Sequence, residues 1–303
     1  MITVCVPDPP AREALVPLDR IQVLVWDGAG EPPDGIGDTQ FLLAPYMGGS
    51  PGAAQLAAMP RLRVIQLLSA GVERWLPLVP AGVTLCNGRG VHGGGTAELA
   101  VAGILALVRE LPGFLAEQAA GRWSPRATDD LDGKRLLVLG AGDIGRRVAN
   151  ALAVFGTQPT FVARTARDGV HGIDELDRLL PDADIVLVAV PQTAETTGLV
   201  DAGFLAALPD RAIVANVARG SIVHTDALLA EVQSGRLRAY LDVTDPEPLP
   251  AGHPLWQAAG VIITPHVGGG THGWERRGYR LVREQVERYL NGEPLHNVVG
   301  ATY

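Results

Sequence analysis

The sequence contains little of what marks disulfide-rich, nucleic-acid-binding or repeat proteins. Only 2 of its 303 residues are cysteine, and only 5% are aromatic. Cys5 and Cys86 each lie in an apolar run, so we expect buried free thiols and a cytoplasmic location. The net charge of −8 comes without a basic stripe, which argues against a nucleic-acid partner. No internal repeat is visible, which argues against a solenoid.

Long hydrophobic runs are also missing. Residues 2–6 predict a strand, without the basic and apolar regions of a secretory signal, so we expect no signal peptide. The longest apolar helix, expected over residues 99–108, is too short to cross a bilayer, so we expect no membrane partner. What the sequence does contain is a globular balance of 47% hydrophobic and 19% charged residues, with 37 glycines and 23 prolines. This length and composition predict two domains with many short connections.

A glycine motif in the middle of the chain is the most informative stretch. The apolar run 136–139 predicts a buried parallel strand, and Gly140, Gly142 and Gly145 follow it at G-x-G-x-x-G spacing. Apolar residues then recur at helical intervals, and residues 160–163 predict the next strand. In this context the first glycine allows a tight turn, the second lets a pyrophosphate approach the backbone, and the third lets the helix pack on the strand. The motif therefore predicts a dinucleotide site at the helix N-terminus.

The first 95 residues predict a small α/β domain with a parallel sheet. Short apolar runs alternate with polar or proline-rich joins, at residues 2–6, 23–26, 41–44, 64–68 and 84–87. Ala70, Gly71 and Val72 follow the fourth run, at the carboxyl end of a strand, where open α/β sheets bind ligands. Thr96 is the expected N-cap of the apolar helix after residue 95, which we expect to be buried as the hinge between two domains.

Strands and helices alternate regularly beyond Lys134. Six strands are expected, at residues 135–139, 159–163, 185–190, 212–217, 238–243 and 261–264. Helices are expected at residues 174–180, 201–208, 225–234 and 273–290, the last returning toward the first domain. The fold class is therefore α/β, with a doubly wound parallel-sheet (Rossmann) cofactor domain over residues 96–274. A smaller flavodoxin-like substrate domain is expected over residues 1–95 and 275–303.

Three expected strand ends in the second half carry reactive side chains. Arg219, Glu247 and His266 follow three successive strands, so their loops emerge at one carboxyl edge, beside the glycine motif. Arginine can hold a carboxylate by two parallel hydrogen bonds, and histidine can transfer a proton near neutral pH. A carboxylate beside the histidine favours the charged imidazole and orients the ring. The set suits the reduction of a 2-keto acid.

Other residues compete for these roles or add to them. His92 and His272 also lie in glycine-rich loops and are alternative bases, and Asp245 lies in the same loop as Glu247. Tyr46 and Met47 lie near a strand end and are candidates for contact with substrate.

These motifs make the chain resemble the D-isomer-specific 2-hydroxyacid dehydrogenase family over essentially its whole length. The glycine fingerprint is accompanied by N-V-A-R-G at residues 216–220, D-V-x-x-x-E-P at 242–248 and T-P-H-x-G at 264–268. The resemblance implies that Arg219 binds and polarises the substrate, that His266 is the general acid/base, and that Glu247 pairs with it. Formate dehydrogenases of this family lack the glutamate, so Glu247 counts against that activity.

The resemblance also implies binding residues and an assembly. The substrate carboxylate is expected to meet backbone amides of Ala70, Gly71 and Val72 together with Arg219, and Asp242 is expected to contact the nicotinamide carboxamide. The expected cofactor-binding residues are Gly140, Gly142, Asp143, Ile144, Gly145, Arg164, Thr165, Pro191, Val217, Asp242 and Thr96. No metal is expected. A homodimer is expected, built on residues 99–123.

One departure from the NAD-binding pattern concerns the cofactor. Relatives that bind NAD carry an acidic residue at the end of the second strand, where it accepts hydrogen bonds from the ribose 2′-OH. That place is Ala163 here, followed by Arg164 and Thr165, and no acidic residue occurs before Asp168. A 2′-phosphate would meet no repulsion and could pair with the guanidinium. The sequence therefore predicts NADP as the preferred cofactor, with NAD possible.

The expected reaction is hydride transfer from NAD(P)H to a small 2-keto acid, giving the D-2-hydroxy acid. The NADPH signature at Arg164 and Thr165 and the compact length resemble the glyoxylate/hydroxypyruvate reductases of the family. D-lactate, phosphoglycerate or a bulkier acid remain alternatives, although no obvious basic cluster beyond Arg219 and Arg89 serves a substrate phosphate. A non-enzymatic, nucleotide-sensing protein of the corepressor type is the alternative from another class.

Overall fold

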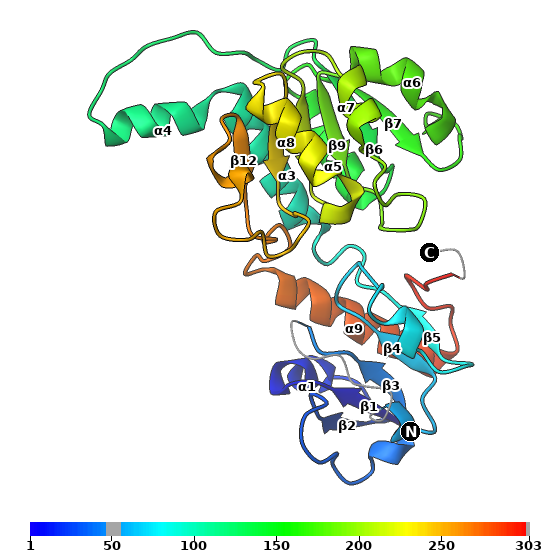
Figure 1. Cartoon of the computed structure of the whole chain (residues 1–303). Helices are drawn as coiled ribbons and strands as arrows, with labels where there is room; N and C mark the ends of the chain where they lie inside the picture. The colour runs from blue at the N-terminus through cyan, green and yellow to red at the C-terminus, as the bar shows by residue number, and fades with distance from the viewer. Residues whose placement is uncertain (47–55, 301–303) are drawn as a thin grey trace. The chain divides into compact units, whose positions relative to one another are not determined.

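The computed structural model of the chain describes residues 1–46 and 56–300 (Figure 1). The chain divides into two compact units, one formed by Met1–His92 with Gly270–Tyr303 and the other by Gly93–Gly269. The first unit is discontinuous, because the C-terminal segment rejoins it after the second unit is complete. Met47, one of the two expected substrate contacts, lies outside the described residues.

The first unit is built on a five-stranded parallel sheet with the order β2-β1-β3-β4-β5. The strands are β1 (Ile2–Val6), β2 (Ile21–Val25), β3 (Thr39–Leu43), β4 (Val64–Gln66) and β5 (Thr84–Cys86). This is the strand order of flavodoxin-like sheets, so the fold class expected for this part is confirmed. Both cysteines are buried and free, as expected.

Among its described residues, the first unit also contains the helices α1 (Pro9–Leu15) and α9 (Trp274–Asn291), with the short 3-10 helices η1 (Ile36–Asp38) and η2 (Leu76–Leu78). The sequence analysis missed α1, because its prolines resemble a loop. Prolines fit the first helical turn, where no N–H is needed, and the Asp8 carboxylate caps that turn by accepting from the Ala11 N–H at 2.8 Å. In α9, Val282 and Val286 are buried in one cluster with Phe41 of β3.

The second unit contains a seven-stranded parallel sheet with the order β12-β11-β10-β9-β6-β7-β8. Its strands are β6 (Arg135–Leu139), β7 (Gln158–Ala163), β8 (His171–Gly172), β9 (Ile185–Val188), β10 (Ile213–Asn216), β11 (Arg238–Leu241) and β12 (Val261–Ile263). The order reverses beside β6, which is the doubly wound arrangement expected for a Rossmann domain. The expectation of six strands was wrong by one, because two-residue β8 has no apolar run to reveal it.

Both faces of this sheet are buried. Alternate residues of β6, β9 and β10 belong to two separate hydrophobic clusters, as the two-residue period of a strand requires. One cluster joins the strands to α3 (Gly93–Val108) and α5 (Asp143–Ala153). The other joins them to α6 (Leu176–Leu179), α7 (Ala202–Ala207) and α8 (Thr225–Gln233). The helices on the two faces are visible in Figure 1.

The predicted start of the apolar helix was wrong. The helix α3 begins at Gly93, so Thr96 lies inside it and is not its N-cap. A Cβ at Gly93 would collide with the carboxylate of Asp143 at the start of α5, so the two helices approach closely here. This packing outweighs the low helix propensity of the glycines. The predicted helix 174–180 is also divided, into η3 (Ile173–Glu175), α6 and η4 (Leu180–Asp182).

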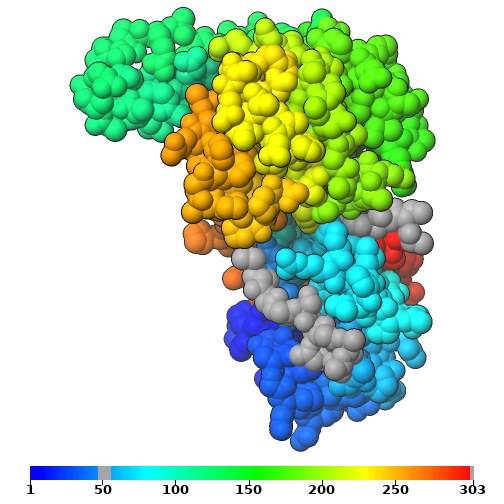
Figure 2. All heavy atoms as spheres, viewed as in Figure 1, coloured from blue at the N-terminus to red at the C-terminus, as the bar shows by residue number. Residues whose placement is uncertain are grey.

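The second unit also carries a projecting segment that the sequence analysis did not anticipate, which we call the arm. It consists of α4 (Leu111–Ala119) and the returning residues 120–130, and it stands away from the rest of the unit in Figures 1 and 2. Trp123 is 95% exposed and Leu115 is 62% exposed on it. Within the described residues, a membrane-crossing length of apolar helix is reached only if α3 and α4, bent by 70°, are counted together.

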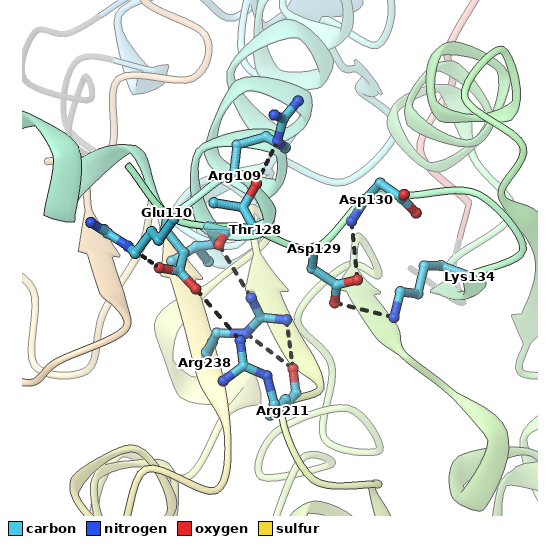
Figure 3. A network of polar contacts seen from close by, with 10 residues as sticks. Arg109, Glu110, Thr128, Asp129, Asp130, Lys134, Arg211 and Arg238 are labelled. Carbon is cyan, nitrogen blue, oxygen red and sulfur yellow. Dashed lines mark hydrogen bonds and ion pairs between the residues drawn. The ribbon is translucent and has the colours of Figure 1, made fainter. Parts of the chain in front are cut away.

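A polar network holds the base of the arm (Figure 3). Arg109, which follows α3, donates to Thr128 Oγ1 in the returning residues 120–130 at 2.9 Å. Asp129 pairs with Lys134 at 3.1 Å, and Arg238 of β11 donates to the backbone oxygen of Leu107 at 3.2 Å. The arm is thus tied at both of its ends to the amino-terminal edge of the sheet.

Candidate functional site

The glycine turn between β6 and α5 has the form of a phosphate cradle. Gly140 has a φ of +107°, and a Cβ there would lie 2.5 Å from the backbone oxygen of Ala189. A Cβ on Gly145 would collide with the backbone oxygen of Gly140. The chain itself therefore requires these two glycines. A Cβ on Gly142 would have nothing within 4 Å, so its open side faces free space at the N-terminus of α5. That combination fits a pyrophosphate.

The remaining expected cofactor residues lie around this turn. Asp143 and Ile144 begin α5, and Asp143 Oδ1 accepts from Arg147 at 2.7 Å. Val217 directly follows β10, and Pro191 lies in the loop after β9, at the same edge of the sheet. The other carboxylate oxygen of Asp143 faces Gly93 of α3, so this side chain contributes to helix packing.

Arg164 and Thr165 follow the end of β7 and are exposed. The Arg164 guanidinium Nη1 lies 3.6 Å from Glu195 Oε2, in an ion pair whose two side chains are 61% and 64% exposed. Glu195 follows β9 and was not singled out from the sequence. The second strand is therefore followed by a cation, and the carboxylate that pairs with it comes from another loop.

His266 and Glu247 form a hydrogen-bonded pair. The imidazole Nδ1 lies 2.6 Å from Glu247 Oε1, and the two side chains are 46% and 44% exposed. They line one wall of a hollow of about 290 Å³, together with Trp256 and Thr244. Asp245, the other acid of this loop, is exposed, and its backbone oxygen accepts from a threonine. The geometry therefore pairs Glu247, and not Asp245, with the histidine.

The His266 turn is bound to the end of β11. His266 has a φ of +52°, a left-handed conformation that is costly for a residue with a side chain. Its N–H donates to the backbone oxygen of Asp242 at 2.7 Å. The buried Asp242 carboxylate accepts from the N–H groups of Val267 at 3.0 Å and Gly268 at 2.9 Å, and from Thr264 Oγ1 at 2.6 Å. Sequence reasoning assigned Asp242 to the cofactor only and missed this loop-holding role.

Arg219 lies on the loop after β10, next to these residues. Asn216 braces this loop, because its side chain donates to the Arg219 backbone oxygen at 2.9 Å and accepts from the Ala218 N–H at 3.1 Å. A Cβ on Gly220 would collide with the backbone oxygen of Thr244, so the loops after β10 and β11 lie in direct contact. Since β10, β11 and β12 are neighbours in the sheet, all three reactive side chains come from one carboxyl edge.

The expected carboxylate loop belongs to the first unit. Ala70 and Gly71 follow β4, and Val72 is buried. Ser69 Oγ donates to the Gly71 backbone oxygen at 2.8 Å, and Asn87 donates to the Ala70 backbone oxygen at 3.2 Å. The loop is thus held from both sides within its own unit.

The two alternative histidines have different surroundings. His92 stacks on the ring of Tyr46 at 4.8 Å between centroids and lies 5.9 Å from the ring of Trp274. Burial raises the pKa of the Tyr46 phenol in this cluster. His272 is exposed on a turn. Among the histidines in the described part of the chain, His171 in β8 and His296 after α9 also pair with glutamates. No group of three or more metal-ligating side chains occurs within residues 1–46 and 56–300.

Comparisons with known proteins show which family the chain belongs to. The family model for the NAD binding domain of D-isomer specific 2-hydroxyacid dehydrogenases matches residues 101–268. Glyoxylate/hydroxypyruvate reductase A of Klebsiella pneumoniae is 35% identical over 67% of this chain and 66% of its own length. D-3-phosphoglycerate dehydrogenase of Mycobacterium tuberculosis is 34% identical over 82% of this chain, which spans only 48% of that relative.

A solved structure extends the likeness to both units. The D-isomer specific 2-hydroxyacid dehydrogenase from Xanthobacter autotrophicus Py2, in complex with NADPH and MES, is 30% identical. It matches with a TM-score of 0.86 over 98% of both chains. The resemblance read from the sequence motifs is therefore confirmed. The chain belongs to the family of D-isomer specific 2-hydroxyacid dehydrogenases, which are NAD(P)-dependent oxidoreductases.

Proposed function

We propose that the protein reduces a small 2-keto acid, of the glyoxylate or hydroxypyruvate type, to the D-2-hydroxy acid. The observation that carries the proposal is the hydrogen-bonded pair of His266 and Glu247, on loops adjoining that of Arg219. The three side chains supply an acid, its partner and a carboxylate-binding cation at one sheet edge. The relationship to glyoxylate/hydroxypyruvate reductase A supports this substrate class.

His266 acts as the general acid through Nε2. Its Nδ1 is engaged by Glu247, so Nε2 is the ring nitrogen left to meet a substrate. A bound nicotinamide supplies the hydride that reaches the carbonyl carbon. His266 gives its proton to the carbonyl oxygen, and Glu247 stabilises the imidazolium and orients the ring. The products are the 2-hydroxy acid, the oxidised nicotinamide and a neutral imidazole, which regains its proton from solvent.

Arg219 binds the substrate carboxylate in this proposal. Its guanidinium can donate two parallel hydrogen bonds to the carboxylate and polarise the adjacent carbonyl. The backbone amides of Ala70, Gly71 and Val72 hold the same carboxylate when the substrate is bound. Asp242 contributes a contact to the carboxamide of the nicotinamide, and Thr96 lies near the cofactor.

NADP is the preferred cofactor in this proposal, with NAD as a weaker alternative. The end of β7 lacks the carboxylate that would repel a 2′-phosphate, and Arg164 offers a charge-assisted partner for it. Thr165 adds a hydroxyl. The ion pair with Glu195 is exposed and 3.6 Å long, so it competes only weakly with a phosphate.

The arm binds a second copy of the chain. Its exposed Trp123 lines an open hollow of about 580 Å³ with Phe114, and a residue so exposed and apolar is typical of an interface centre. The polar network at the base of the arm fixes its position for this contact.

Buried free thiols at Cys5 and Cys86 suit a reducing compartment such as the cytoplasm.

The test is the initial rate of NADPH and NADH oxidation with a panel of 2-keto acids. The panel contains glyoxylate, hydroxypyruvate, pyruvate, 3-phosphohydroxypyruvate and a bulky aryl keto acid. We expect the highest kcat/KM with glyoxylate or hydroxypyruvate and NADPH. The relationship to phosphoglycerate dehydrogenase favours the phosphorylated acid as second candidate, but Arg89, the cation near the carboxylate loop, already donates to Asn297 at 3.2 Å. Tight NADPH binding without turnover of any acid would instead indicate a nucleotide sensor.

A further inference from the structure

A chain of three side chains runs from the middle of the second unit to the turn that carries His266. Tyr240 lies in β11, and its hydroxyl is 2.9 Å from Thr264 Oγ1. Thr264 Oγ1 in turn donates to Asp242 Oδ1 at 2.6 Å. Neither Tyr240 nor Thr264 was assigned a function from the sequence.

The direction of the hydrogen bonds follows from the chemistry of the groups. An ionised carboxylate can only accept, so the single hydroxyl proton of Thr264 is used toward Asp242. The Tyr240 hydroxyl must therefore be the donor to Thr264. Burial raises the pKa of the Tyr240 phenol to about 12, so it keeps the proton that this role requires.

The position of Tyr240 is determined by packing. Its side chain is only 1% exposed, and a Cβ at Gly103 of α3 would overlap its ring. The missing side chain at Gly103 thus makes room for the ring of Tyr240. The phenol cannot move without displacing α3, and it presents its hydroxyl at a constant place on the Thr264 side.

Asp242, the last of these three hydrogen-bonded residues, holds the His266 turn. Asp242 holds the N–H groups of Val267 and Gly268, the two residues after His266. The backbone of Asp242 holds the N–H of His266 itself. The Thr264 side chain thus binds the segment before His266 to the same carboxylate that holds Val267 and Gly268 after it. The left-handed conformation of His266 is enclosed between these bonds.

We propose that Thr264, supported by Tyr240, is a positioning residue that aligns the imidazole of His266 for proton transfer. The proposal rests on the function proposed above, in which His266 is the general acid. Neither residue touches the substrate in this role. Loss of the Thr264 hydroxyl leaves Asp242 Oδ1 with one donor fewer and frees the segment between Thr264 and His266. Since proton transfer depends steeply on alignment, the chemical step weakens before binding does.

The test compares Thr264→Val, which keeps the shape and removes the hydroxyl, with Thr264→Ser, which restores the hydroxyl. Rates are expressed per site able to bind NADPH, titrated by tryptophan fluorescence. We expect Thr264→Val to lower kcat on the order of 10- to 100-fold. The KM for the keto acid and the Kd for NADPH should stay within about threefold, and Thr264→Ser should recover most of kcat. An unchanged kcat per site for Thr264→Val, or no recovery with serine, overturns the proposal.

Tyr240→Phe tests the supporting role. It should lower kcat roughly two- to tenfold alone, but add nothing to Thr264→Val, because the phenol acts only through the threonine hydroxyl. An equal additional loss in the double variant contradicts the support of Thr264 by Tyr240.

Thr157→Val is the matched control, since Thr157 Oγ1 is buried without a hydrogen-bond partner among the described residues, and its kcat per site should be unchanged. His266→Ala separates the two proposals. If this variant keeps full activity, the proposed function fails. An inactive His266→Ala together with a fully active Thr264→Val rejects only the positioning role of Thr264.

Discussion

The imidazole Nδ1 of His266 and the carboxylate Oε1 of Glu247 lie 2.6 Å apart, although the two residues come from loops after different strands. The bond leaves Nε2 as the nitrogen that can serve a substrate, and it determines which of two nearby acids is the partner. Both side chains are nearly half exposed, so the bond orients the ring more than it stabilises the fold.

Replacing His266 by alanine should abolish the chemical step while leaving the cofactor site intact. We expect kcat for keto acid reduction to fall on the order of 10²- to 10⁴-fold, because no other group delivers the proton. The Kd for NADPH, measured by fluorescence titration, should hardly change. His272→Ala, which replaces an exposed histidine on a turn later in the chain, is the control and should keep wild-type kcat. A large loss with His272→Ala and none with His266→Ala would reverse the assignment.

Replacing Glu247 by glutamine should also lower kcat. The amide cannot stabilise the imidazolium and can hold the ring in the wrong tautomer, so we expect a fall of about 10- to 1000-fold in kcat with little effect on NADPH binding. Steady-state kinetics across the pH range would measure it. Asp245→Asn removes the neighbouring exposed acid and should be nearly silent; equal losses in both variants would indicate a general effect of loop charge.

Replacing Arg164 by alanine should reduce the preference for NADPH over NADH. The 2′-phosphate loses its charge-assisted partner, so we expect kcat/KM for NADPH to fall by roughly tenfold or more, with the NADH value nearly constant. Glu195→Gln is the complementary variant. It removes the competing carboxylate at 3.6 Å and should lower the KM for NADPH by about two- to fivefold at low ionic strength. An unaltered cofactor ratio in Arg164→Ala would place the phosphate elsewhere.

Replacing Trp123 by alanine should weaken self-association. Trp123 is 95% exposed in the single chain, so its loss has little cost for the folded unit, but at an interface it would raise the dimer Kd by about 30-fold or more. Sedimentation velocity over a concentration series measures the shift. Val154→Ser, at a site 78% exposed outside the arm, is the control and should leave the dimer unchanged. A wild-type chain that sediments as a monomer at every concentration would refute the dimer.

The sequence was sufficient for the fold class and for the order of the strands other than β8, because these depend on local patterns. Apolar runs of four or five residues with glycine or proline joins revealed every strand except β8, whose two residues carry no such run. Helix boundaries were harder to predict from the sequence. The start of α3 at Gly93 depends on contact with Asp143, and α4 lies on a protruding arm whose apolar residues have no partner cluster in the described chain.

The candidate site divides in the same way. By itself, the sequence determined which residue types follow which strand, since the glycine turn, Arg219 and His266 are read from motifs beside apolar runs. Only the tertiary structure decided that Glu247 rather than Asp245 meets His266, that Arg164 faces Glu195, and that Tyr240 supports Thr264. The physical reason is that strand pairing brings together residues far apart in the chain, and hydrogen bonds between them depend on distances of a few tenths of an ångström, which no local pattern records.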